Sequence, residues 1–120
     1  MKESNRQKKF GRLIQQELSA IFQRDFSVPG GVMLTVTVVR STPDLAIARI
    51  YVSVFPEAKG GETVAHLNES MKEIRHLLGR RIRQNVRHIP ELEFFLDDTL
   101  QEVERMDRLF DEIKQSDPDA

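Results

Sequence analysis

The sequence predicts an α+β domain in which a three-stranded sheet is covered by helices on one face. Residues 5–24 and 63–82 repeat apolar side chains every three or four positions, as on the buried side of an amphipathic helix. Residues 34–38, 48–54 and 92–97 alternate apolar with polar side chains, as in a half-buried strand. A chain of 120 residues has the size of one domain. The predicted order is therefore helix, strand, strand, helix, strand, followed by a last helix.

The first helix is expected to span about Asn5 to Arg24 and to end before the Val28-Pro29-Gly30-Gly31 segment. The next two strands, Leu34 to Val38 and Ala48 to Val54, are joined by a turn around Pro43. Such a short connection predicts an antiparallel hairpin. One face of this hairpin is apolar, so helices must cover it. The first helix offers an apolar stripe for that purpose, formed by Phe10, Leu13, Ile14, Leu18, Ile21 and Phe22.

The middle of the chain predicts a loop over Glu57 to Glu62 and then a helix from about Thr63. Pro90 ends any helix before it, because the residue that precedes a proline avoids the α region. Leu92 to Asp97 is the third strand, and the passage from strand to helix to strand predicts a parallel crossover. The helix is expected to bury one stripe in the core, formed by Val64, Leu67, Met71, Ile74, Leu78 and Ile82.

The C-terminal part begins with a capping-box signature, Thr99 with Glu102, which predicts the start of the last helix. We expect a single domain over residues 1–115 and a disordered tail over residues 116–120. The apolar side of the last helix would consist of Leu100, Val103, Met106, Phe110 and Ile113.

Charge is segregated along the chain, although the formal net charge is only −1. Residues 1–24 carry a net charge of +4 and residues 72–88 carry +5, whereas residues 25–71 carry −2 and residues 89–120 carry −8. Charge blocks can be no more than solvated helix faces, but two basic blocks in one small domain also predict a surface for a polyanion.

The block at residues 72–88 suits RNA phosphates, because arginine offers planar, paired donors and is always charged. From Ile74 to His88 there are five arginines and no acid, so the arginines would repel one another, and a bound polyanion would relieve that repulsion. Cations in the first half of a helix oppose its dipole, so those of the first block are candidates for ligand contacts, unless they belong to a frayed, solvated terminus. The block at residues 72–88 lacks Phe, Tyr and Trp, which favours recognition of RNA backbone and shape over base stacking. The candidate RNA-binding residues are Arg6, Lys8, Lys9, Arg12, Lys72, Arg75, Arg80, Arg81, Arg83 and Arg87.

Other functions find little support in the sequence. The glycine-rich loops that hold nucleotides are absent. The chain has no cysteine, which excludes disulfides and thiolate metal sites and favours an intracellular setting. Met1 to Lys9 does not resemble a signal peptide, and no apolar run is long enough to span a bilayer. The remaining alternative to RNA binding is a protein-interaction module that docks an acidic partner through its basic face.

Two histidines and two glutamates share one side of the second predicted helix and suggest a metal-dependent enzyme as a further hypothesis. A di-metal bundle site of this spacing needs a second copy on another helix, and the sequence has none, so a solvated face is favoured. We expect no catalytic residue, no metal and no cofactor. The four residues are His66, Glu69, Glu73 and His76.

Several short motifs occur in a specific order and spacing. They are Glu17-Leu18, Val36-Thr37-Val38, Ser41, Asp44-Leu45, Ala48, Ile50-Tyr51-Val52-Ser53, Ile74-Arg75, Leu78, Pro90-Glu91-Leu92, Phe94 and Asp97. Together they resemble the bacterial family of ribosome-binding factor A over about Arg6 to Ile113, and the hairpin carries the strongest part of the match.

This resemblance implies a type II KH-like domain of α-β-β-α-α-β order with an added C-terminal helix, in which a kink separates the second helix from a third. It implies a non-catalytic, cytoplasmic and monomeric assembly factor that binds the 16S ribosomal RNA of free 30S subunits. Small-subunit ribosomal proteins are candidate further partners. The family's role also implies late maturation and 5′-end processing of that RNA and growth after cold shock.

The sequence departs from the family at the kink, where an Ala-x-Gly motif aligns with Ser70-Met71-Lys72 and glycine is missing. Propensity alone predicts a continuous helix across this position. The alternative is that the kink persists, with Ser70 bonding to the nearby backbone. The backbone geometry at this position decides the direction in which the arginine side chains that follow it point.

Overall fold

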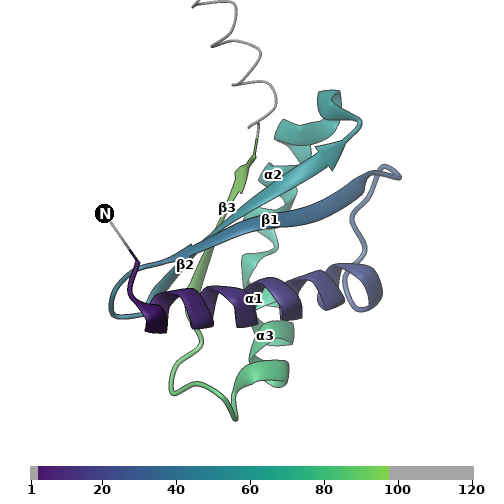
Figure 1. Cartoon of the computed structure of the whole chain (residues 1–120). Coiled ribbons are helices and arrows are strands. Elements are labelled where there is room, and N and C mark those ends of the chain that lie inside the picture. Colours follow the sequence, from purple (N-terminus) through teal and green to yellow (C-terminus); the bar gives the residue numbers. More distant parts are fainter. Residues whose placement is uncertain (1–2, 98–120) are drawn as a thin grey trace, which may run out of the picture.

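The structure is a computed structural model that describes residues 3–97 (Figure 1). The expected last helix, the domain boundary at residue 115 and the expected tail lie outside these residues. The described elements follow the α-β-β-α-α-β order, which confirms that prediction. They are α1 (Asn5–Arg24), β1 (Met33–Ser41), β2 (Ile47–Phe55), the short 3-10 helix η1 (Glu57–Lys59), α2 (Gly60–Glu69), α3 (Met71–Ile82) and β3 (Glu91–Leu96).

The three strands form one sheet in the order β1-β2-β3. β1 and β2 pair antiparallel and β2 and β3 pair parallel, as the short hairpin and the strand–helix–strand passage predicted. A bulge between Val36 and Val38 shifts the register within β1. Because of this shift, Val36 and Val39 are both buried, although strict alternation would place them on opposite faces.

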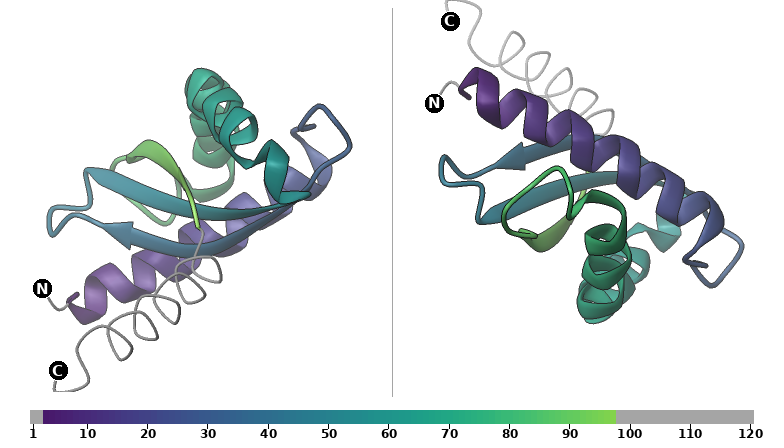
Figure 2. Two further views of the ribbon diagram at one scale, coloured as in Figure 1. Left: turned by 90° about the horizontal axis from the view of Figure 1, so that it is seen from above. Right: turned by 90° about the horizontal axis from the view of Figure 1, so that it is seen from below.

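All three long helices lie on one face of the sheet, and the core fills the space between them and the strands. β2 is the central strand, and its inward side chains Ala48, Ile50, Val52 and Val54 are buried. Figure 2 shows α1 running along the hairpin while α3 is seen nearly end-on, so the two helices cross at a steep angle. Burial of each large aliphatic side chain contributes about 1.5–3 kcal/mol. The fully buried helix residues include Ile14, Leu18, Ile21, Leu67, Ile74, Leu78 and Ile82.

Two contacts fix the first half of α1 against β1. A capping box joins Ser4 to Gln7, and the Gln7 side chain also donates to the backbone oxygen of Ser41 at 2.8 Å. One turn later, a Cβ added at Gly11 would lie 3.0 Å from the backbone oxygen of Val39. Glycine therefore allows helix and strand backbones to approach closely at this point.

The prediction of a continuous helix across Ser70 is wrong. α2 ends at Glu69 and α3 begins at Met71, and Ser70 between them has φ −93° and ψ 12°, away from the usual helical values. The serine side chain makes no capping hydrogen bond, so it does not hold the break.

Tertiary contacts explain this break. The Asn68 side chain accepts a hydrogen bond from the Phe94 nitrogen at 2.9 Å and donates one to the Phe94 oxygen at 3.0 Å, which ties α2 to the edge strand β3. α3 instead buries Ile74 and Leu78 and packs beside α1. The two helix segments dock on different partners, and these contacts override the helix propensity of the linking residues.

The loop predicted over Glu57 to Glu62 is also wrong, because residues 57–59 form η1 and α2 begins at Gly60. Gly60 is buried, and a Cβ at this position would approach Leu96 Cδ2 to 2.9 Å. The two glycines that suggested a loop belong to the first turn of the helix, where one of them packs against the end of β3.

Candidate nucleic-acid interface

A basic groove of about 650 Å³ follows the outer side of α3 and the loop that leads to β3. α3 directs Ile74, Leu78 and Ile82 into the core, so its charged residues are left on the surface. Among the described residues that line the groove, Glu91 is the acid. Five of the six cations predicted from residues 72–88 line it: Lys72, Arg75, Arg80, Arg83 and Arg87.

Arg75 holds the wall of this groove in place. Its Nε donates to the backbone oxygen of Pro90 at 3.1 Å, and its Nη2 donates to that of Ile89 at 2.8 Å. Ile89 also lies against Gly79, where an added Cβ would come within 3.3 Å of Ile89 Cγ1. Arg75 therefore positions the loop that carries Arg87, and three of its five N–H donors remain for a ligand.

Arg81 turns away from the groove toward α1. Its Nε lies 2.5 Å from Glu17 Oε2 and its Nη1 lies 3.7 Å from Asp25 Oδ2. The hydrogen bond to Glu17 raises the pKa of Arg81 above its ordinary value, and the negative charges of Glu17 and Asp25 act in the same direction against the effect of desolvation. The sequence from Ile74 to His88 contains five arginines and no acid, but Glu17 of α1 and the C-cap residue Asp25 supply two acids to Arg81.

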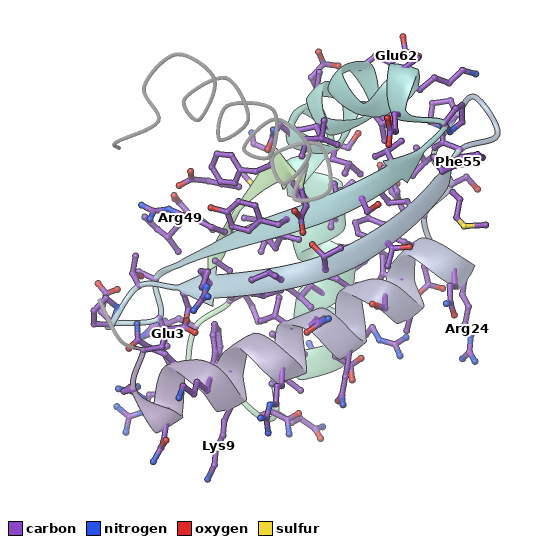
Figure 3. All side chains as sticks on the ribbon, turned by 45° about the horizontal axis from the view of Figure 1, so that its top comes forward. Glu3, Lys9, Arg24, Arg49, Phe55 and Glu62 are labelled. Carbon is purple, nitrogen blue, oxygen red and sulfur yellow. The ribbon has the colours of Figure 1, made fainter. Side chains whose placement is uncertain are left out.

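Arg80 borders two hollows on the surface of α3. It lines the basic groove and also a neighbouring hollow of about 550 Å³, which is lined as well by Arg24 of α1 and by Asp25, the C-cap residue that follows. Arg24, which is not among the candidate residues predicted from the sequence, projects from the last turn of α1 and extends the cationic surface (Figure 3). Among residues 3–97, the ion pairs involve Arg40 and Arg81 and include none of Arg80, Arg83 and Arg87.

The two basic blocks of the sequence meet beyond the C-terminal end of α3. A cavity of about 610 Å³ is lined by Arg6 and Lys9 of α1 and by Arg87 and His88 of the loop after α3. Lys9 projects away from the sheet (Figure 3). Arg6, Lys8, Lys9 and Arg12 are all exposed, but Lys8 and Arg12 do not line this cavity.

The histidine and glutamate set does not form a cluster. The break at Ser70 separates His66 and Glu69 from Glu73 and His76, and the His66 ring packs at 5.9 Å from that of Phe26. In the part of the chain that the structure describes, no three His, Cys, Asp or Glu side chains gather as metal ligands would. Nor does any described helix have the length and apolar character of a membrane span.

The fold and the groove define a small α+β binding domain with a cationic face. The sequence matches the family model described as ribosome-binding factor A over residues 6–110, and the chain belongs to that family. Its fold is accordingly the type II KH-like fold, with the break between α2 and α3 at Ser70.

Two relatives, one of them represented by two structures, illustrate the similarity. The ribosome-binding factor A of Christiangramia forsetii is 38% identical over 110 residues, which cover 90% of this chain and 84% of the relative. The crystal structure of the Thermus thermophilus protein is 25% identical with a TM-score of 0.60, over 75% of this chain and 94% of that one. A homology model of the T. thermophilus factor, as fitted into the cryo-electron-microscopy map of its complex with 30S, is 26% identical with a TM-score of 0.55, over 78% and 93% of the two chains.

Proposed function

We propose that this chain is a non-catalytic assembly factor that binds free 30S ribosomal subunits through their 16S ribosomal RNA. The observation that carries the proposal is the groove along α3, where five cations gather around a single described acid. Membership of the ribosome-binding factor A family supports it, as does the complex of the T. thermophilus relative with 30S.

The groove residues would act as phosphate ligands. Arg80, Arg83 and Arg87 are exposed and form no ion pair among the described residues, so their guanidinium groups are available for paired hydrogen bonds to phosphate oxygens. Lys72 adds a cation at the start of α3, next to the break at Ser70. Arg75 contributes its remaining donors, and we expect Arg81 to contribute least because Glu17 and Asp25 already hold it. The α1 cations Arg6, Lys8, Lys9 and Arg12 would extend the contact.

The cellular role that we propose is late maturation of the small subunit, including processing of the 5′ end of 16S RNA, in the cytoplasm and during adaptation to cold. Its support is the family membership. Cells that lack the protein should accumulate free 30S subunits with unprocessed 16S RNA, above all after a temperature downshift. Normal processing in those cells would contradict this role while leaving 30S binding intact.

Sedimentation through sucrose gradients tests 30S binding directly. The purified protein should sediment with free 30S subunits at low salt and dissociate as salt rises, because each neutralised phosphate releases counterions. Digestion of the sample with ribonuclease separates RNA binding from the protein-interaction alternative. Association that survives digestion of the accessible RNA would favour an acidic protein partner for the basic face.

A further inference from the structure

We propose that the cavity between α1, the β1–β2 turn and the loop after α3 receives a single unpaired nucleotide of the bound RNA. This inference rests on the proposed function and adds a site to it. Two segments far apart in the sequence, the start of α1 and residues 85–88, meet here beside the hairpin turn (Figure 1). The cavity volume of about 610 Å³ falls within the range of about 300–1,000 Å³ that is common for pockets of small organic ligands.

The floor of the cavity is apolar. Phe10 is only 6% exposed, and Leu13, Leu45 and Val86 are partly buried against the same core. A surface that contacted only a run of phosphates would gain nothing from such a floor, because phosphates stay hydrated. The flat face of a nucleobase gains from contact with apolar and aromatic side chains.

The rim of the cavity is cationic. Arg6 and Lys9 stand on the α1 side, and Arg87 stands on the opposite side. Arg87 also lines the groove along α3, so the cavity and the groove share this residue. An apolar floor inside a cationic rim matches a nucleotide whose base enters the cavity while its phosphates remain at the mouth.

The β1–β2 turn brings polar groups to the base in a fixed position. Asp44 Oδ1 accepts hydrogen bonds from the Thr42 hydroxyl at 2.8 Å and from the Ala46 nitrogen at 3.2 Å. These bonds, that of Thr42 first, lower the pKa of Asp44, so the carboxylate is ionised at neutral pH and only accepts hydrogen bonds. Asn85 offers an exposed amide from the opposite wall.

Leu45 supports the idea that this turn is built for a ligand. Its φ is +60°, in the left-handed region that leucine rarely adopts, and its nitrogen donates to the Thr42 oxygen at 2.8 Å. Strained backbone of this kind persists where the surroundings hold it and often occurs at binding sites. Here it accompanies a leucine side chain that lines the cavity.

The test compares two RNA hairpins that differ by one bulged guanosine, whose base edge presents N–H donors to an acceptor such as Asp44. The wild-type protein should bind the bulged hairpin about tenfold more tightly than the fully paired one. The substitution Asn85→Trp fills the cavity without changing charge, and it should bring this ratio close to one while the affinity for the paired hairpin is retained.

Gln84→Trp is the matched control, because Gln84 is exposed on the same loop and does not line the cavity. This variant should keep the wild-type ratio. Equal binding of both hairpins by the wild-type protein, or an unchanged ratio in Asn85→Trp, would overturn the nucleotide site while leaving the proposed function standing. Failure of the wild-type protein to bind either hairpin or 30S subunits would overturn both. Thermal unfolding of each variant shows that it is folded.

Discussion

Arg80 and Arg81 are neighbours in the sequence and have opposite surroundings in the fold. Arg81 lies against α1, with Glu17 and Asp25 within ion-pair distance, and about one third of its side chain is exposed. Arg80 is exposed and lines the groove that also contains Arg83 and Arg87. The comparison teaches that the number of arginines in a stretch does not give the charge available to a ligand, because acids from a distant helix neutralise part of it. We therefore assign Arg81 to packing between α1 and α3, and Arg80 to the ligand.

The largest effect is expected when two groove arginines are reversed. Arg80→Glu with Arg83→Glu removes two phosphate contacts and adds repulsion, so affinity for 30S subunits should fall about 100-fold or more in a filter-binding titration. Arg105→Glu with Arg108→Glu changes the net charge equally, outside the described residues, and should have a small effect. Equal losses in the two double variants would mean that only net charge matters and that the groove is wrongly assigned.

A second prediction concerns the position of α1, which supplies the acids that hold Arg81. Gly11→Ala improves helix propensity by about 1 kcal/mol, but the new Cβ would lie 3.0 Å from a strand carbonyl that has little room to move. We expect a net loss of about 1–2 kcal/mol in the free energy of unfolding, measured with urea. The control is Gly61→Ala, which meets nothing within 4 Å and should stabilise by about 0.5 kcal/mol. Stabilisation by both would show that α1 and β1 are less tightly packed than described.

A third prediction separates the two arginines directly. Arg80→Gln should weaken 30S binding about fivefold and leave the melting temperature unchanged, because the side chain has a ligand role and no ion pair among the described residues. Arg81→Gln should lower the melting temperature by at most a few degrees, as befits a partly exposed ion pair, and should affect binding less. The reverse pattern, with Arg81 more important for binding, would exchange the two roles.

The smallest effect is expected from releasing Arg81. Glu17→Gln removes the closer of its two acidic partners, so the guanidinium becomes freer to meet RNA, and the electrostatic attraction to the polyanion also rises by one charge. Affinity for 30S should increase by about twofold at low salt, with a small loss of thermal stability. Gln16→Lys is the control, because it raises the net charge by one, as Glu17→Gln does, at an exposed neighbouring position. This variant should leave thermal stability unchanged. A similar loss of stability in this control would show that the Arg81–Glu17 pair is not what holds α1 against α3.

Much of the fold could be predicted from hydrophobic periodicity. The bounds of α1 agree with the prediction. The two strands of the hairpin extend a few residues beyond their predicted bounds, and the parallel third strand begins and ends one residue earlier than predicted. The break at Ser70 could not be predicted from propensity, because Asn68 fixes α2 to Phe94, which lies 26 positions later in the chain. The early start of α2 could not be predicted because two adjacent glycines are typical of a loop, whereas Gly60 packs against Leu96 in the first turn of the helix.

The candidate site was predictable in composition and not in arrangement. The cations of the groove follow from counting charges in residues 72–88. The pairing of Arg81 with Glu17 joins residues 64 positions apart, and the meeting of Arg6 with Arg87 depends on the crossing of α1 and the α3 loop. Neither contact can be recognised within a short window of sequence. Asp44, Leu45 and Asn85 became site candidates only when the fold brought their segments together.

The salt dependence of 30S binding is the most direct test of the division between Arg80 and Arg81. The slope of log Kd against log salt counts the phosphates that are neutralised, and it is insensitive to modest losses of stability. We expect the slope to fall by about one for Arg80→Gln and to stay at the wild-type value for Arg81→Gln. An equal fall in both variants, or a fall confined to Arg81→Gln, would contradict the assignment of the groove side of α3 to ribosomal RNA.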